Sequence, residues 1–230
     1  MVKVALLVLL GCAPGDPGGS PPVAAIPNPL DEGWEVVGRR DGVVVYQRPH
    51  AGSPHPEVLA VGILDVPPWV AKNAVDDVVA DDGMPYLAEA RILKRDERGL
   101  VIYNRVSPPL VADRDYAIRF FDQSYTIGGV TIWIARWRTA NDEGPPKRSG
   151  VVRVPINEGY WRFEPVDGGK RTRASYWVFT DPGGAVPAPL AAVGSTTLLP
   201  DVVNGLAARA RRPKYRAKMP PVPTRPLPGP

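Results

Sequence analysis

Short strand-forming stretches separated by turn residues fill most of this chain, and they restrict the folds that it can adopt. The stretches 34–39 and 43–48 flank Arg40-Asp-Gly42, and an Asp-Gly turn between two such stretches is a strong signal of a β-hairpin. Similar stretches lie at 58–64, 86–95, 100–106, 114–121, 130–138, 151–163 and 172–179. The connections between them are rich in Gly, Pro and Asp. The sequence therefore predicts one long, curved antiparallel sheet.

Two other stretches have helical periodicity. Pro67 and Pro68 begin a stretch that runs to Ala80, and proline is common in the first turn of a helix. Residues 187–212 are the longest helical candidate, and Pro200 is expected to kink or divide this helix. A curved sheet that lays its concave face against one long helix encloses space. The predicted class is α+β, with the sheet wrapped around a long C-terminal α-helix and an internal hydrophobic cavity.

The first residues have the features of an export signal. Met1-Val-Lys3 is a short positive region, and the apolar run at 4–10 is at the lower length limit for the hydrophobic part of a signal peptide. The run ends at Gly11-Cys12, which looks like a bacterial lipobox, and Cys12 is the only cysteine in the chain. We therefore expect a lipoprotein signal peptide at 1–11 and lipid attachment at Cys12, unless the apolar start arose by chance on a cytosolic protein.

A lipidated Cys12 predicts an exported protein of the cell envelope, because two or more acyl chains hold a protein stably on a membrane. Ala13 follows the cysteine where enteric bacteria use aspartate as an inner-membrane retention signal. In a Gram-negative cell this favours the outer membrane, with the protein facing the periplasm.

Prolines mark the ends of the folded unit. Of the 29 prolines, six lie in the first 30 residues and seven in the last 18. Such compositions are typical of linkers and tails. The predicted organisation is a Pro/Gly-rich tether at 12–31, a folded domain at 32–212 and a Pro-rich basic tail at 213–230.

The basic charge of the chain is concentrated in that tail. Seven of the 28 Lys and Arg residues follow Gly205, where there is no Asp or Glu, so 21 basic residues stand against 24 acidic ones before it. We expect a solvated tail, with contact to anionic lipid headgroups as the alternative. Nucleic acid is not an expected partner, because no nucleic-acid-binding motif accompanies the charge.

Five motifs, in order along 32–212, resemble the START (StAR-related lipid-transfer) family of helix-grip domains. Two of them are Pro108-Pro-Leu-Val-Ala-Asp-Arg-Asp-Tyr116, which resembles the lead into an Arg-Asp-aromatic motif, and Gly159-Tyr-Trp-Arg-Phe-Glu-Pro165, which resembles a Gly-aromatic-Pro strand. The others are the opening hairpin at 34–48, the strand at 87–95 and the turn at 181–187 into the closing helix. Where the family has an N-terminal helix, this sequence has the Pro-rich tether.

The resemblance implies a cavity that holds one lipid or other hydrophobic molecule, without a cofactor. Glu89 resembles a position where some members place a cavity carboxylate, and Phe120 stands where some carry a cavity arginine, which suggests a drier tunnel. The predicted ligand-binding residues are Glu89, Arg91, Tyr103, Arg105, Phe120, Trp133, Trp161, Leu190 and Val193. The alternative for the polar members is the solvent face of the sheet, where alternating Glu and Arg are ordinary.

The turn before the closing helix is a candidate lid hinge, at Gly183, Gly184 and Pro200, although such a turn needs glycines in any case. Arg114 and Asp115 are expected to be structural, and Trp133, Trp137, Trp161 and Trp177 to form core or cavity wall.

The predicted function is the binding of a hydrophobic ligand, with transfer as an extension of it, and no catalytic or metal-binding residue is predicted. His50 and His55 lie in a proline-rich connection, and Asp76-Asp77 and Asp81-Asp82 lack the spacing of a calcium loop. One alternative is a cyclase related to the polyketide aromatase/cyclases, with Glu89 and Tyr103 as its acid–base pair. The other is an envelope interaction module with a packed interior.

Overall fold

The structure is a computed structural model that describes residues 32–78, 86–108, 111–184 and 198–224. The expected signal peptide, tether and Cys12 lie outside the described residues, as do Leu190, Val193 and the first part of the expected closing helix.

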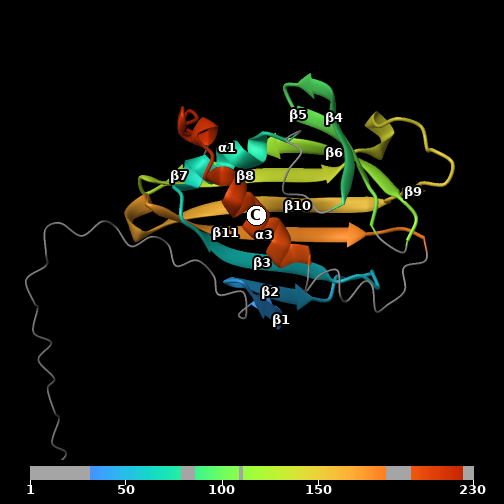
Figure 1. The fold of residues 1–230 in the computed structure, drawn as a ribbon, viewed down its shortest axis with the longest axis horizontal. Coiled ribbons are helices and arrows are strands. Elements are labelled where there is room, and N and C mark those ends of the chain that lie inside the picture. The colour runs from blue at the N-terminus through green and yellow to red at the C-terminus, as the bar shows by residue number, and fades with distance from the viewer. Residues whose placement is uncertain (1–31, 79–85, 109–110, 185–197, 225–230) are drawn as a thin grey trace, which may run out of the picture.

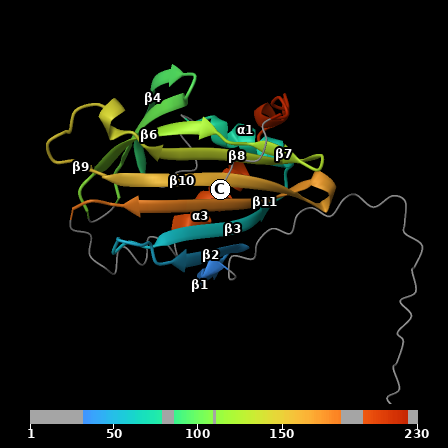
Figure 2. The same ribbon diagram turned by 180° about the vertical axis from the view of Figure 1, so that it is seen from behind.

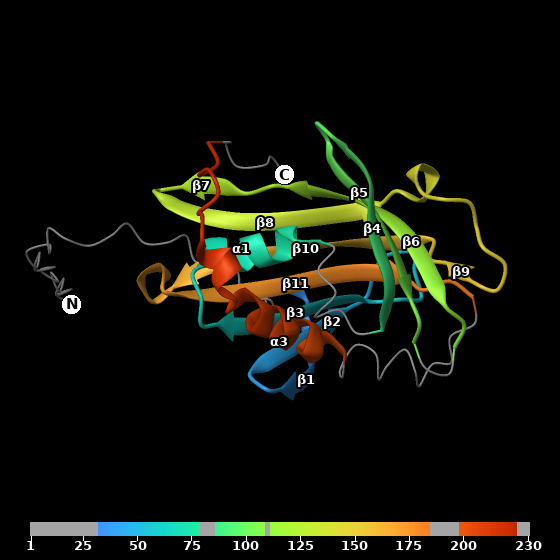
Figure 3. The ribbon, with the colours of Figure 1, turned by 45° about the horizontal axis from the view of Figure 1, so that its top comes forward.

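Eleven strands lie in the described part of the chain and form the large antiparallel sheet that the sequence predicts. They are β1 (Glu35–Arg40), β2 (Val43–Arg48), β3 (Glu57–Leu64), β4 (Leu87–Asp96), β5 (Gly99–Val106), β6 (Arg114–Asp122), β7 (Tyr125–Ile127), β8 (Val130–Thr139), β9 (Val152–Arg153), β10 (Ile156–Val166) and β11 (Arg171–Asp181). Their main order is β1-β2-β3-β11-β10-β8-β6-β5-β4, with β7 paired to β8 and the short β9 parallel to β6. The sheet is curved, and β4 and β5 turn steeply away from the direction of β8 and β10 (Figure 3).

The expected strand at 151–163 is divided in the structure. The chain forms β9, passes Pro155 and then forms β10, which continues to Val166. Proline has no backbone N–H to donate to a strand ladder, so it separates the two pairings.

Two α-helices in the described residues cover one face of the sheet. They are α1 (Pro68–Asp76) and α3 (Leu199–Ala210), and they lie in front of the strands in Figure 1 and behind them in Figure 2. Short 3-10 helices form at η2 (Asn141–Glu143), η3 (Asp167–Gly169) and η5 (Pro213–Arg216). No helix among the described residues is long and apolar enough to cross a membrane.

Both helices carry a proline in their first turn. Pro68 lies in the first turn of α1, which ends at Asp76 rather than at Ala80 as expected. Pro200 lies in the first turn of α3, where the missing N–H of proline breaks no intrahelical hydrogen bond. The expectation that Pro200 kinks or divides a longer helix stays a prediction, because residues 185–197 lie outside the described residues.

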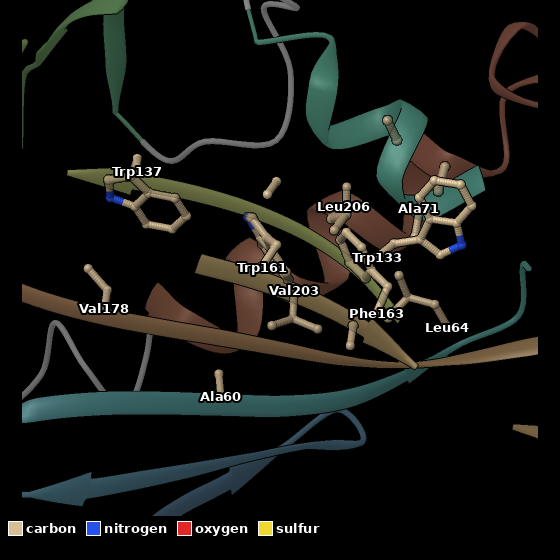
Figure 4. Close-up of a cluster of buried hydrophobic side chains, with 14 of the residues drawn as sticks. Ala60, Leu64, Ala71, Trp133, Trp137, Trp161, Phe163, Val178, Val203 and Leu206 are labelled. Carbon is tan, nitrogen blue, oxygen red and sulfur yellow. The ribbon is translucent and has the colours of Figure 1, made fainter. Parts of the chain in front are cut away.

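The hydrophobic core fills the space between the concave face of the sheet and the two helices. Alternate residues of the strands point into it, and Val203 and Leu206 of α3 meet Phe163 and Trp161 of β10 there (Figure 4). α3 approaches the sheet closely at Gly62 of β3, where an added Cβ would lie 3.0 Å from Val203 Cγ1.

The domain continues past the predicted boundary at residue 212. Tyr215 of η5 is 4% exposed and belongs to the core. Asn73 of α1 donates from Nδ2 to the carbonyl oxygens of Tyr215 at 2.9 Å and Lys218 at 2.8 Å. The tail prediction for 213–218 is corrected accordingly, because an aromatic anchor and backbone hydrogen bonds hold this segment against α1.

Candidate functional site

An apolar cavity of about 150 Å³ lies between the concave face of the sheet and the helices. Its walls come from the end of α1, from β4, β5, β6, β8, β10 and β11, and from α3. The lining residues are Val75, Val78, Leu87, Ile102, Asn104, Tyr116, Ile118, Phe120, Trp137, Asn157, Trp161, Tyr176, Val202, Leu206 and Arg209. Successive side chains of a strand point to opposite faces, so only alternate residues of β5 and β6 line the cavity. Asn104, Tyr116, Ile118 and Phe120 stand on that inner face.

Aromatic rings form one wall of the cavity. The ring of Tyr176 lies 4.6 Å from that of Trp161 and 5.6 Å from that of Trp137, measured between centroids. Gly159 lets these rings pack, because a Cβ there would lie 2.3 Å from Trp137 Cζ2. This wall offers an apolar ligand a broad, rigid contact surface.

The polar groups of the cavity are almost all neutral. Asn104 hydrogen-bonds to Tyr116, and burial raises the pKa of Tyr116 above its usual range. Trp137 Nε1 donates to Asn157 Oδ1 at 2.8 Å. Burial also raises the pKa of Tyr176, so its phenol stays protonated at neutral pH. Groups of this kind orient a ligand by hydrogen bonds rather than by charge.

Arg209 is the one cationic side chain among the described lining residues, and it is occupied by protein partners. Its Nε donates to the Tyr215 hydroxyl at 3.1 Å, and its Nη2 donates to the Asp77 carbonyl oxygen. Arg209 thus joins α3, the end of α1 and η5 at the edge of the cavity.

The predicted ligand-binding residues divide between the two faces of the sheet. Phe120 and Trp161 line the cavity, whereas Trp133 is buried in the core and does not. Tyr103 and Arg105 alternate with the lining residues of β5 and stand on the opposite face. Glu89 and Arg91 of β4 pair with Arg105 and Tyr103 on that face, because the register shifts between Leu87 and Glu89. The expectation that these four line the cavity is therefore corrected.

On that opposite face the four residues join a charged cluster. Glu89 lies 3.2 Å from Arg91, 3.6 Å from Arg105 and 3.3 Å from Arg148. The guanidinium of Arg91 lies 5.0 Å from the centre of the Tyr103 ring. The proposed acid–base pair of Glu89 and Tyr103 consequently has no access to the cavity in this structure.

Asp115 has the structural role expected for it. Its carboxylate accepts from Arg153 Nε at 2.7 Å and from the Tyr103 hydroxyl at 3.0 Å. Arg114 donates to the carbonyl oxygen of Ala112 at 2.6 Å. Arg119, which the sequence did not single out, is 2% exposed and pairs with Asp96 at 2.7 Å and with Glu143. These contacts hold the segment from η2 to β9 against β5 and β6.

The candidate hinge glycines both adopt positive φ, +65° at Gly183 and +61° at Gly184. A Cβ at Gly183 would lie 3.0 Å from Pro155 Cδ, so turn geometry and close packing both favour glycine there. No group of His, Cys, Asp and Glu that could hold a metal ion occurs in the parts of the chain that the structure describes.

A second hollow, of about 330 Å³, lies on the convex face of the sheet. Arg136, Arg162, Arg173 and Glu164 are among its lining residues, so it is far more polar than the concave cavity. The concave cavity is the better candidate for an apolar ligand.

Trp137, expected in the core or the cavity wall, lines the cavity. Sequence reasoning missed Asn104, Tyr116, Asn157 and Tyr176 as lining residues. The signal for three of them was their register, because Asn104 and Tyr116 lie directly opposite each other on β5 and β6, and Tyr176 lies opposite Trp161. Register between strands is not visible before the sheet is assembled.

Comparison with known proteins agrees with the fold predicted for this chain. No protein-family model matches the sequence. An uncharacterized protein of Pseudomonas aeruginosa is 30% identical over 168 residues, which is 71% of this chain and 80% of that protein.

Two solved structures are similar over most of their length. A STAR-related lipid transfer protein from Xanthomonas axonopodis has 26% identity and a TM-score of 0.68, covering 78% of this chain and 99% of that chain. Human StAR-related lipid transfer protein 5 has 17% identity and a TM-score of 0.66, covering 78% and 86%. The curved sheet, the C-terminal helix and these similarities together show that the chain has the fold of the START (StAR-related lipid-transfer) domains.

Proposed function

We propose that this protein binds a hydrophobic molecule in the concave cavity and exchanges it with a membrane. The observation that carries the proposal is the cavity itself, with its aromatic wall of Trp137, Trp161 and Tyr176 and its aliphatic lining from α1 and α3. Similarity of fold supports it, since proteins with the same fold are described as lipid transfer proteins.

The size of the cavity limits how the ligand is held. About 150 Å³ matches cavities that accept a benzene-sized molecule. We therefore expect a compact apolar part of the ligand to occupy this space. Burial contributes about 0.8 kcal/mol for each CH₂ group, so a short segment already supplies useful affinity.

Native mass spectrometry of the full chain, followed by solvent extraction, tests the proposal. We expect an apolar molecule to co-purify, or a fluorescent fatty-acyl probe to bind. Ile118→Trp fills the cavity and should abolish binding, whereas Ile63→Trp, at an exposed position of β3, should not. The proposal would be contradicted if the wild-type protein purified without a ligand and also did not bind the probe.

We also propose that lipidated Cys12 tethers the protein to a membrane of the cell envelope. The lipobox-like end of the apolar run and the single cysteine support this. Metabolic labelling with palmitate should mark the wild-type protein and not Cys12→Ala, and only the wild type should sediment with membranes. Equal sedimentation of both proteins would reject the anchor.

The described C-terminal residues suit contact with anionic headgroups during exchange. Arg216 and Lys218 are exposed, and Met219 and Val222 are 50% and 47% exposed beside them. Cations near a membrane surface contribute about 1 kcal/mol each. Sedimentation with phosphatidylglycerol vesicles, but not with phosphatidylcholine vesicles, is the expected result.

We propose binding rather than catalysis because Glu89 and Tyr103, the acid–base pair of the cyclase alternative, face away from the cavity.

A further inference from the structure

The hollow on the convex face of the sheet forms around the small side chain of Ser175 on β11. Trp177 and Arg173 stand on the same face of β11, two residues away on either side. Arg162 of β10 and Val61 of β3 lie directly across from Ser175 on the neighbouring strands. One short side chain among longer ones leaves a depression in the sheet. The helices α1 and α3 lie behind the strands in Figure 2, so neither of them covers this face.

The arginines of this hollow have few partners. Four arginines and two glutamates line it, and Arg48 is already held by Glu57 at 2.8 Å. None of the described residues accepts a hydrogen bond from Arg173, and the buried Nε of Arg162 has no hydrogen-bond partner among them either. A buried donor without a partner costs free energy, which a carboxylate or phosphate oxygen can recover through a charge-assisted hydrogen bond.

Glu164 lies beneath these two arginines and neutralises only part of their charge. It is 1% exposed, its Oε1 lies 2.6 Å from Arg162 Nη2, and it pairs in register with Arg173. Burial raises the pKa of Glu164 above its usual value, although both arginines act to lower it. Both carboxylate oxygens are buried, whereas the side chain of Arg162 is 30% exposed. A molecule that enters the hollow therefore meets guanidinium groups with an excess of positive charge.

An aromatic surface adjoins the arginines. Tyr160 and Trp177 lie opposite each other on β10 and β11, and their rings stack with centroids 5.4 Å apart. Trp34 and Tyr46 also line the hollow. Its volume of about 330 Å³ exceeds the 150 Å³ of the concave cavity, so it has room for a ring together with a charged group. Aromatic side chains favour the stacking of another flat ring.

We propose that the convex hollow is a second binding site, for a small molecule that carries a carboxylate or phosphate group on a flat aromatic ring. The anionic group binds Arg162 and Arg173, whose guanidinium forks match its geometry. The ring lies against Tyr160 and Trp177. The sheet itself separates this site from the concave cavity, so the two sites can be tested independently.

Isothermal titration calorimetry of the full chain with 1-naphthyl phosphate tests the proposal. Ile118→Trp fills only the concave cavity, so the affinity for this probe should be equal in the wild type and in that variant. Glycerol 3-phosphate lacks the ring, and 1-naphthol lacks the negative charge. In the Ile118→Trp background each of them should bind at least about tenfold more weakly than 1-naphthyl phosphate. Added salt should weaken the binding of 1-naphthyl phosphate.

Two variants separate the charge of the site from its shape. Arg173→Gln should weaken 1-naphthyl phosphate about tenfold, because it removes a guanidinium group that contacts the anion. Ser175→Phe fills the hollow and should abolish binding. Arg138→Gln is the matched control, since Arg138 stands on the same face of β8 as Arg136 but does not line the hollow. It removes the same charge and should leave the affinity unchanged. Thermal unfolding shows whether each variant is folded.

The proposal is overturned if 1-naphthyl phosphate does not bind the wild type, or if Ile118→Trp abolishes its binding, which would place the probe in the concave cavity. It is also overturned if Arg138→Gln weakens binding as much as Arg173→Gln, because the effect would then be one of overall charge. Binding of glycerol 3-phosphate as tight as that of 1-naphthyl phosphate would remove the aromatic part of the assignment. None of these results bears on the proposed function of the concave cavity.

Discussion

At the scale of single residues, Asp115 and Arg153 form a buried ion pair. Asp115 is 1% exposed, and Arg153 reaches it with two nitrogen atoms, at 2.7 and 3.1 Å. Burial alone would raise the pKa of Asp115, but the hydrogen bonds from Arg153 and Tyr103 outweigh it and lower the pKa below its usual value. The ion pair therefore requires the carboxylate to be ionised.

Removing that charge should be strongly destabilising. Asp115→Asn leaves Arg153 buried without a counter-charge, at a cost of about 3–5 kcal/mol in the free energy of unfolding. Tyr103→Phe removes only one hydrogen bond and should cost about 1 kcal/mol. Urea denaturation at pH 7 measures both, with Tyr46→Phe on the convex face as the control. Equal losses for the two variants would contradict this account.

The same pair predicts a pH dependence. The folded pKa of Asp115 is lower than the unfolded one, so its stabilising contribution is complete above the ordinary carboxyl pKa and is lost as the pH falls through the folded value. The wild-type protein should lose stability from about pH 4 downward. The Asp115→Asn variant should show a shallower decline, which urea denaturation at several pH values would reveal.

Gly159 is a steric requirement of the cavity wall. Its Cβ would lie 2.3 Å from Trp137 Cζ2 and 2.5 Å from the Trp177 carbonyl oxygen. Gly159→Ala should therefore destabilise the protein by about 2 kcal/mol or more and weaken ligand binding through Trp137. Gly150→Ala is the comparison, because Gly150 has open space around it and only a positive φ of 76° to strain. A larger loss at Gly150 would contradict the steric explanation.

At the scale of elements, α1, α3 and η5 hold one another beside the cavity. Asp77, just after α1, accepts from the Tyr215 hydroxyl and from Lys214 Nζ, both at 2.8 Å. Arg209 of α3 donates to the Asp77 carbonyl oxygen. The end of α1 is thus the point at which the C-terminal segment and the cavity-lining helix are joined.

Asn73→Ala should release the C-terminal segment without unfolding the sheet. It removes two hydrogen bonds, to the carbonyl oxygens of Tyr215 and Lys218. Trypsin should then cleave after Lys214 and Arg216 several times faster, as followed by mass spectrometry. Asn204→Ala is the control, because the Asn204 side chain makes only a 3.5 Å contact with the Asp41 carbonyl oxygen. Unchanged cleavage in Asn73→Ala would show that Tyr215 alone retains the segment.

At the scale of the whole molecule, the residues that follow the predicted boundary at 212 contribute to the stability of the domain. A chain that ends at residue 212 lacks Tyr215, which is 4% exposed and packs in the core. It should lose about 3 kcal/mol relative to a chain that ends at residue 218, comparable to removing a buried aromatic side chain. Thermal unfolding of the two truncations provides the measurement, and equal midpoints would place the boundary at 212 after all.

The sequence by itself determined the sheet and the positions of α1 and α3, and its motifs carried the resemblance to the START family. Alternation of apolar and polar residues, the Asp-Gly turn at 41–42 and the prolines before α1 and α3 are local signals, and each acts within a few residues. They were sufficient to predict the curved antiparallel sheet, whereas the helix-grip architecture followed from the resemblance to the START domains. The prolines before α1 were also sufficient to locate its start.

Only the tertiary structure decided which face of β4 and β5 encloses the cavity. Both faces of these strands carry polar residues, Asn104 on one face and Glu89 and Arg105 on the other. Alternation therefore separates the residues into two faces but does not indicate which face is the inner one. The inner face depends on the direction in which the sheet curves. It also depends on Arg148, before β9, and Arg153, in β9, which pair with Glu89 and Asp115. Those are long-range contacts between segments far apart in the sequence, and local patterns carry no information about them.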